Sequence, residues 1–346
     1  MGRSALSMEG NMKGLFALPP ASIALRGALL LAAVTASQAR LAAADQLRAV
    51  AGVQGDSGKQ ALAFLPNEVW IHSGDSITWT FPTDERHTVT FLMPGQIRPR
   101  FQNGCPGSTP DGSSYDGTAC VNSGVLMDGQ TYTVTFPLPG NFKLTCLVHV
   151  YMTGVVHVLD PAEPLPHDQT FYDQEADAER SELLSDASRL AGRGEGIVRR
   201  TSDTGVAAGI SEVVATTGGG VHTSSVMRFL RDQIVVHVGD TVEWTNLAPG
   251  VNHTVTFGAE PEDPFAPKSF NVTTDADGAL HAVIGSPTDD VHSGLFGPAP
   301  GERVNVAQAP PGVTRFRVTF TAPGTFHYIC TLHDTQGMVG TVMVHP

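Results

Sequence analysis

The segment Phe64-Leu-Pro-Asn-Glu-Val-Trp-Ile-His-Ser-Gly-Asp-Ser-Ile-Thr-Trp79 occurs a second time in this 346-residue chain, as Phe229-Leu-Arg-Asp-Gln-Ile-Val-Val-His-Val-Gly-Asp-Thr-Val-Glu-Trp244. In both copies, short runs rich in β-branched and aromatic residues end at a Gly-Asp pair, which is typical of strands joined by tight turns. Further along, His87-Thr-Val-Thr-Phe91 matches His253-Thr-Val-Thr-Phe257, and residues 132–158 match residues 316–344. A unit repeated at this length predicts two structurally equivalent domains.

Each copy alternates apolar and polar residues as a half-buried strand does. Tyr132, Val134 and Phe136 share one face of a predicted strand. The chain also has 37 glycines and 24 prolines, which favour turn-rich β structure over helical bundles. We therefore expect two all-β sandwich domains, at about residues 46–160 and 201–346.

The segment between the two units, residues 161–200, has a different composition. It opens with prolines and continues into a predicted helix at about 169–191, with Tyr172, Leu183 and Leu190 on one apolar stripe. Gly192 then marks the expected helix end. We expect the stripe to pack on one or both sandwiches, and a solvated spacer is the alternative.

The N-terminus, residues 1–44, has the pattern of an export signal. Basic residues precede the apolar run Gly27–Thr35, and small residues follow it up to Ala44. The run is shorter than the roughly 20 apolar residues that a membrane-spanning helix requires. The sequence thus predicts a periplasmic or extracellular protein with no membrane span after signal removal.

The formal net charge of -13 argues against nucleic acid as a partner, and no basic stripe occurs in the sequence. An acidic surface would instead speed the encounter with a basic-faced protein.

Each copy of the unit contains two histidines, one cysteine and one methionine at matching places. Two imidazoles, a thiolate and a weak axial thioether are the ligands of a blue-copper electron-transfer site. We therefore predict one type 1 copper ion per domain. The predicted ligands are His87, Cys146, His149 and Met152 in the first domain, and His253, Cys330, His333 and Met338 in the second.

The spacing of these residues suits a single loop at one end of a sandwich. A strand that ends in Cys146 or Cys330 leads into a tight turn that returns a histidine and a methionine to the same ion. We expect the histidine edge of such a loop to lie near solvent, where a redox partner would dock. The alternative is that the cysteines are buried structural thiols and the methionines core residues.

Both halves resemble the cupredoxins of the plastocyanin and amicyanin group. Cys330-Thr-Leu-His333-Asp-Thr-Gln-Gly-Met338 is similar to the plastocyanin loop, and the shorter Cys146-Leu-Val-His149-Val-Tyr-Met152 resembles that of amicyanin. The resemblance implies two Greek-key β-sandwiches and an electron carrier that works with a donor or acceptor redox protein. The unequal loops lead to the hypothesis that the two sites differ in reduction potential.

The other two cysteines, Cys105 and Cys120, lie in a Gly/Ser/Pro-rich insert without a neighbouring histidine. In an oxidising compartment, spare thiols pair, so we predict a disulfide between them.

Two other functions compete with electron transfer. Fused cupredoxin enzymes, such as oxidases and nitrite reductases, need a further copper held by extra histidines. They also normally carry a histidine beside the ligand cysteine, whereas the neighbours here are Thr145 and Leu147, and Ile329 and Thr331. Copper storage or delivery would favour runs rich in methionine or histidine, and the nine methionines are scattered. The sequence thus favours an electron carrier over an enzyme.

Overall fold

The computed structural model describes residues 44–99, 105, 107–215, 220–248, 250–299, 302, 308 and 310–346. Residues 44–346 form one compact unit. The expected export signal lies outside the described residues except for Ala44. Within the described ranges, we find no helix long and apolar enough to cross a membrane.

The first half of the chain forms two layers of strands. Two central strands, β1 (Gln46–Gln54) and β4 (Ser76–Thr80), pair in parallel. Their layer also contains β2 (Lys59–Leu65), β6 (Ser113–Ser114) and β8 (Thr131–Thr135). The other layer comprises β3 (Glu68–His72), β10 (Thr153–Leu159), β9 (Gly140–Thr145), β5 (Thr90–Phe91) and β7 (Val121–Asn122).

The second half repeats this arrangement. Here β11 (Gly205–Ala215) and β14 (Thr241–Leu247) form the parallel pair. Their layer also contains β12 (Val221–Leu230), β16 (Thr273–Thr274), β17 (Leu280–Ile284) and β19 (Arg315–Phe320). The facing layer comprises β13 (Gln233–His237), β21 (Val339–His345), β20 (Gly324–Ile329), β15 (Thr256–Phe257) and β18 (Val291–His292). The prediction of two tandem β-sandwiches is confirmed.

The alternating residues of the sequence form the two cores. Tyr132, Val134 and Phe136 are buried, and Trp79 of the repeated segment lies in the same core. Trp244 occupies the matching place in the second core. Fully burying a large apolar side chain contributes about 1.5–3 kcal/mol, so the repeated alternation accounts for much of the stability of each sandwich.

The two sandwiches share a sheet, which the sequence did not predict. Strand β2 of the first half pairs antiparallel with β12 of the second, with Leu62 opposite Thr223 and Gln60 opposite Ser225. Strand β10 of the other layer also pairs with β12, with Thr153 opposite Val221, so backbone pairing joins 16 strands from both halves. Each sandwich covers an edge strand of the other, which removes two exposed edges.

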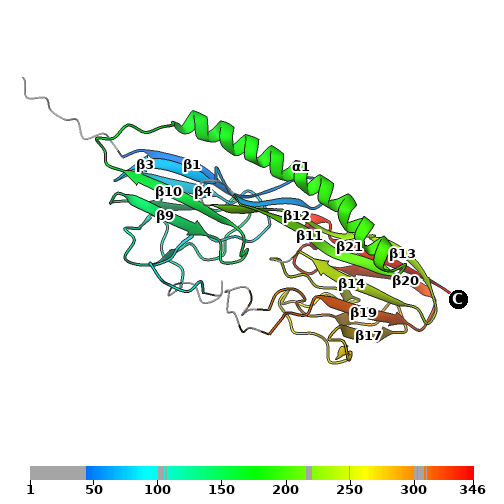
Figure 1. The fold of residues 1–346 in the computed structure, drawn as a ribbon. Helices are drawn as coiled ribbons and strands as arrows, with labels where there is room; N and C mark the ends of the chain where they lie inside the picture. The colour runs from blue at the N-terminus through cyan, green and yellow to red at the C-terminus, as the bar shows by residue number, and fades with distance from the viewer. Residues whose placement is uncertain are drawn as a thin grey trace, which may run out of the picture. The chain divides into compact units, whose positions relative to one another are not determined.

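Helix α1 (Gln169–Thr201) packs against strands of both halves, so the expected packing is confirmed (Figure 1). Leu183 belongs to a buried cluster with Ala61 and Leu65 of the first half. Leu190 belongs to another with Ile210 and Leu230 of the second. The side chain of Asp168 caps the helix by accepting a hydrogen bond from the backbone N–H of Phe171.

The expected end of the helix, near residue 191, is wrong. The helix continues through Gly192 and Gly194 to Thr201. Gly194 is buried, and a Cβ atom there would lie 2.3 Å from Cδ1 of Leu230. The glycine thus allows a close approach between the helix and β12 and does not mark a stop.

Cys105 and Cys120 form a disulfide, as predicted. The bridge closes a loop of 15 residues, which contributes about 3 kcal/mol in the chain-entropy account.

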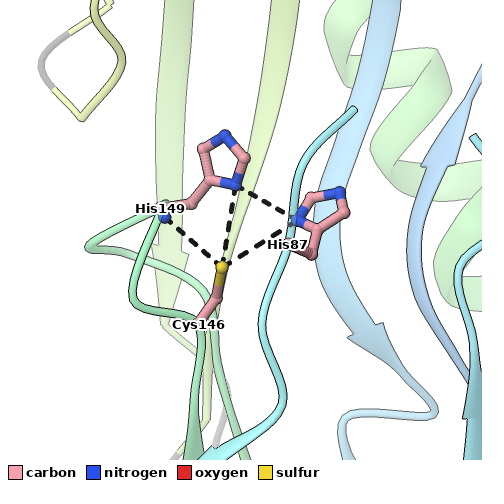
Figure 2. A group of neighbouring side chains, drawn as sticks. All are labelled: His87, Cys146 and His149. Atoms are coloured by element: carbon pink, nitrogen blue, oxygen red, sulfur yellow. Dashed lines mark hydrogen bonds between the residues drawn. The ribbon is translucent and has the colours of Figure 1, made fainter. Parts of the chain in front are cut away.

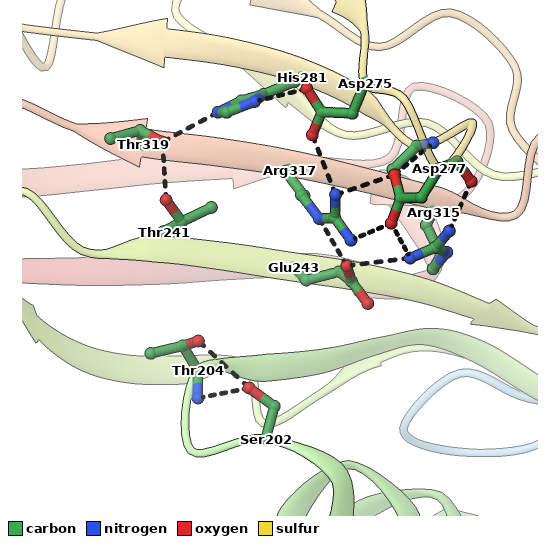
Figure 3. A network of polar contacts seen from close by, with 11 residues as sticks. Ser202, Thr204, Thr241, Glu243, Asp275, Asp277, His281, Arg315, Arg317 and Thr319 are labelled. Carbon is green, nitrogen blue, oxygen red and sulfur yellow. Dashed lines mark hydrogen bonds and ion pairs between the residues drawn. The ribbon is translucent and has the colours of Figure 1, made fainter.

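A network of charged residues joins β14 to β19 and to the turn beside β17 (Figure 3). Arg317 on β19 pairs with Glu243 at 2.7 Å, with Asp275 at 2.9 Å and with Asp277 at 2.7 Å. Arg315 also pairs with Asp277, at 2.8 Å. Three carboxylates of the second domain are thus paired with two guanidinium groups.

Candidate metal centres

The first candidate centre brings together His87, Cys146 and His149 (Figure 2). Cys146 follows directly after β9, and His149 lies in the loop that leads to β10. His87 is held by two backbone hydrogen bonds with Leu126. Cys146 Sγ lies 4.0 Å from His87 Nδ1 and 3.9 Å from His149 Nδ1, and the two nitrogens are 3.1 Å apart.

The second centre has the same construction. Cys330 follows β20, and His333 precedes the short 3-10 helix η1 (Asp334–Gln336). Cys330 Sγ lies 4.0 Å from His253 Nδ1 and 3.3 Å from His333 Nδ1, and the two nitrogens are 3.2 Å apart. His253 forms the equivalent bridge with Phe296.

The donor atoms of each centre fit a single copper ion. In each set, one sulfur and two imidazole nitrogens lie within 4.8 Å of one another, and all three residues are buried. Backbone N–H groups point at the sulfurs, from Thr88 to Cys146 at 3.4 Å and from Thr254 to Cys330 at 3.3 Å. Such hydrogen bonds stabilise a thiolate, the form of cysteine that binds metal.

The charge state of both thiols agrees with a metal-binding role. Burial alone would raise the pKa of the Cys146 thiol, but His149 and His87 lower that pKa well below its usual range. For Cys330 the effect of burial is likewise exceeded by His333 and His253, and its pKa is also lowered. A thiolate with two imidazoles is the equatorial donor set of a blue-copper site.

Met152 and Met338 are buried in the same cores as the ligand cysteines. The backbone N–H of Cys146 donates to the carbonyl of Met152, and that of Cys330 donates to the carbonyl of Met338. Both loops are therefore closed in the same way, although η1 lengthens the second. The axial role of the two methionines stays a prediction.

Two glycines behind the centres escaped the sequence analysis. Gly52 and Gly209 have φ values of +76° and +73° and lie at β-bulges in β1 and β11. A Cβ atom at Gly52 would lie 2.1 Å from His87 Nε2, and one at Gly209 would lie 2.4 Å from Nε2 of His253. The signal was present in the repeat, as Ala51-Gly52-Val53 and Ala208-Gly209-Ile210.

The expected exposure of the histidine edges is wrong. His149 is 4% exposed and His333 is 3% exposed. Their Nε2 atoms lie 3.3 and 3.5 Å from the two carboxylate oxygens of Glu85. The histidine edges are buried because the shared sheet and the helix hold the two ligand loops against each other.

Glu85 was also missed by the sequence analysis. Its carboxylate is buried and accepts a further hydrogen bond from Gln336 at 3.0 Å. Burial alone would raise its pKa, but the hydrogen bond from His149 and the charge of His333 lower that pKa far below the usual range. The repeat offered one clue, since the matching residue in the second half is the apolar Val251.

Apolar side chains surround this contact. A small cavity between the loops is lined by both histidines and by residues of both halves, among them Val125, Val148, Val251, Leu295 and Leu332. The guanidinium of Arg86 also lies 5.9 Å from the centre of the Phe265 ring, across the same interface. The surroundings of the two histidine edges are thus largely apolar.

Comparison with known proteins assigns both halves to one family. The family model for copper-binding proteins of the plastocyanin/azurin family matches residues 51–159 and 215–345. Amicyanin-alpha of Methylorubrum extorquens is 33% identical over 138 residues, which cover 39% of this chain and 98% of that protein.

Two solved structures are similar to a part of the chain. Amicyanin from Paracoccus versutus is 20% identical with a TM-score of 0.22, and the match covers 34% of this chain and 83% of that one. Oxidised plastocyanin from Dryopteris crassirhizoma is 18% identical with a TM-score of 0.20, and covers 40% and 98% respectively. The family-model match, which spans most of both halves, carries the assignment: the chain belongs to the plastocyanin/azurin family of copper-binding proteins, with one copper centre in each of two tandem domains.

Proposed function

We propose that the protein is an exported blue-copper electron carrier, with one type 1 copper ion in each domain. The domains span about residues 46–160 and 201–346, and residues 161–200 join them. His87, Cys146, His149 and Met152 hold one ion, and His253, Cys330, His333 and Met338 hold the other. A redox protein, with a basic face that complements the acidic chain, supplies or accepts the electron.

The observation that carries this proposal is the pair of buried two-histidine, one-thiolate sets. Imidazole serves both oxidation states of copper and thiolate favours Cu(I), so one arrangement tolerates the gain or loss of an electron. The burial of these ligands also favours an ion that stays in the protein over one that is delivered to another protein. Transfer of copper to a partner would need ligands that the partner can reach. The Cys105–Cys120 disulfide supports export, since disulfides persist in oxidising compartments.

Copper titration of the purified chain from residue 45 tests the proposal. We expect an intense visible thiolate-to-copper band that saturates at two ions per chain. Cys146→Ser and Cys330→Ser should each remove one ion and its part of the band, because each removes one thiolate. Copper bound without such a band would contradict the proposal and favour storage or delivery.

A further inference from the structure

A single carboxylate connects the two metal centres. Glu85 Oε1 lies 3.3 Å from Nε2 of His149, and Oε2 lies 3.5 Å from Nε2 of His333. These histidines belong to different centres, and their other ring nitrogens face Cys146 and Cys330. Among the ion pairs of the described residues, Glu85 is the one carboxylate shared by two ligand sets.

The proton that a metal-bound histidine keeps on Nε2 fits this contact with Glu85. A histidine that binds a metal through Nδ1 keeps its proton on Nε2 and donates it, often to a carboxylate. Both Nε2–H groups can therefore donate to Glu85 when both centres are filled. One carboxylate then orients two histidines that serve two different ions.

Nothing in the fold requires a carboxylate at this position. The second domain has Val251 at the matching place and builds an equivalent centre. A buried carboxylate is unfavourable unless charged or polar groups pair with it. Here Gln336 donates to Glu85 Oε2, and Gln60 in turn donates to Gln336 Oε1 at 3.0 Å. Gln336 and Gln60 thus form a chain of hydrogen bonds that ends on Glu85, within an otherwise apolar interface.

We propose that the His149–Glu85–His333 bridge passes electrons between the two centres within one chain. This inference rests on the proposed function, since it needs a redox-active copper ion in each domain. In the transfer, one centre goes from Cu(I) to Cu(II) and the other from Cu(II) to Cu(I). One electron moves, both Nε2 protons stay on their imidazoles, and no bond to a ligand breaks.

The interface contacts favour this transfer. The side chains of Val148, Val251 and Leu332 line the cavity beside the bridge, and an apolar surrounding of low dielectric constant strengthens the hydrogen bonds to Glu85. Glu85 acts as a positioning residue, because it touches the ligand histidines and not the ions.

The test measures the rate of electron transfer between the centres in the two-copper chain. A Met338→Leu background separates the two reduction potentials, because the axial ligand tunes the potential of such a centre. The Cys146→Ser and Cys330→Ser chains supply the spectrum of each centre alone. After a reducing pulse, the visible spectra then follow the electron from one centre to the other.

Glu85→Gln is the informative variant. Its amide oxygen can accept from one imidazole, but its NH₂ group cannot accept from the other. Loss of one buried hydrogen bond to a charged group lowers the bridged population, and with it the transfer rate, by about tenfold. Asp84→Asn is the matched control, because Asp84 is the neighbouring residue and lies in a groove beside Ala176 of α1. We expect it to keep the parent rate.

Two further measurements show whether a lower rate comes from loss of the bridge or from a change in the copper centres themselves. Copper content and pulsed EPR of the fully oxidised chain report whether both centres, and the distance between them, are unchanged. Glu85→Asp withdraws the carboxylate by one methylene while keeping its charge, and we expect the same loss of rate.

An unchanged rate in Glu85→Gln, with both centres filled, would overturn the proposal. So would loss of the first copper in both Glu85 variants, because Glu85 would then be a support of that centre alone. A parent chain without any blue band would instead contradict the proposed function.

Discussion

At the scale of single residues, the ligand histidines depend on backbone that leaves them space. His87 and His253 are fully buried, and each ring lies against a glycine in a β-bulge. The bulge turns the first strand of each domain toward the imidazole, so the strand forms the back wall of the centre. Gly52 and Gly209 are therefore as much a part of the metal site as its ligands are.

Gly52→Ala should damage the first centre without affecting the second. The new methyl group would clash with the His87 ring, so copper affinity at that centre should fall by at least about tenfold, which corresponds to 1.4 kcal/mol. Copper titration, followed by the visible band, measures this. Gly95→Ala is the control, because Gly95 has a φ of +75° and no atom within 4 Å of its Cβ position. Equal copper binding by both variants would show that the close contact is unimportant.

At the scale of elements, helix α1 contains two glycines with opposite roles. Gly192 has open space at its Cβ position, whereas Gly194 lies against Leu230. Alanine at either position gains the same helix propensity, about 1 kcal/mol. The clash at Gly194 is an overpacked contact, which costs about 1–3 kcal/mol.

We therefore expect Gly192→Ala to raise the free energy of unfolding and to exceed Gly194→Ala by about 1–3 kcal/mol. Chemical denaturation of the two copper-loaded variants measures the difference. If Gly192→Ala were the more destabilising of the two, the helix would end near residue 191, with Gly192 as its left-handed cap.

The elements also explain what the sequence could and could not predict. The alternating strands and both ligand triads follow from the repeat, because identical patterns need the same fold to bury the same faces. The pairing of β2 with β12 does not, since two edge strands meet through surfaces whose fit depends on the whole fold. Glu85 was hidden for the same reason, as its partner His333 lies in the other domain. Gly192 was misjudged because a glycine within a helix and one at its end look alike in sequence.

At the scale of the molecule, the same contacts serve stability and chemistry. The shared sheet and α1 fix the two sandwiches, and this brings His149 and His333 to the two oxygens of Glu85. The histidine edge of each centre is thereby directed at the other domain. The shared sheet thus makes an internal redox partner possible.

The two domains should also unfold together. Copper binds the preformed centres of the native state more tightly than the unfolded chain, and a ligand at a thousandfold excess over its dissociation constant adds up to about 4 kcal/mol of stability. Because α1 and the β2–β12 pair belong to both halves, that stability should be shared by the whole of residues 44–346. We expect one calorimetric transition in the two-copper chain, with both centres losing colour over the same temperatures. Cys146→Ser should lower the temperature of this single transition without splitting it.

The copper-free chain is the control, and we expect it to unfold once, at a lower temperature still. Two separate transitions in Cys146→Ser would mean that the sandwiches fold independently, and the shared sheet would then be too weak to hold Glu85 between the centres.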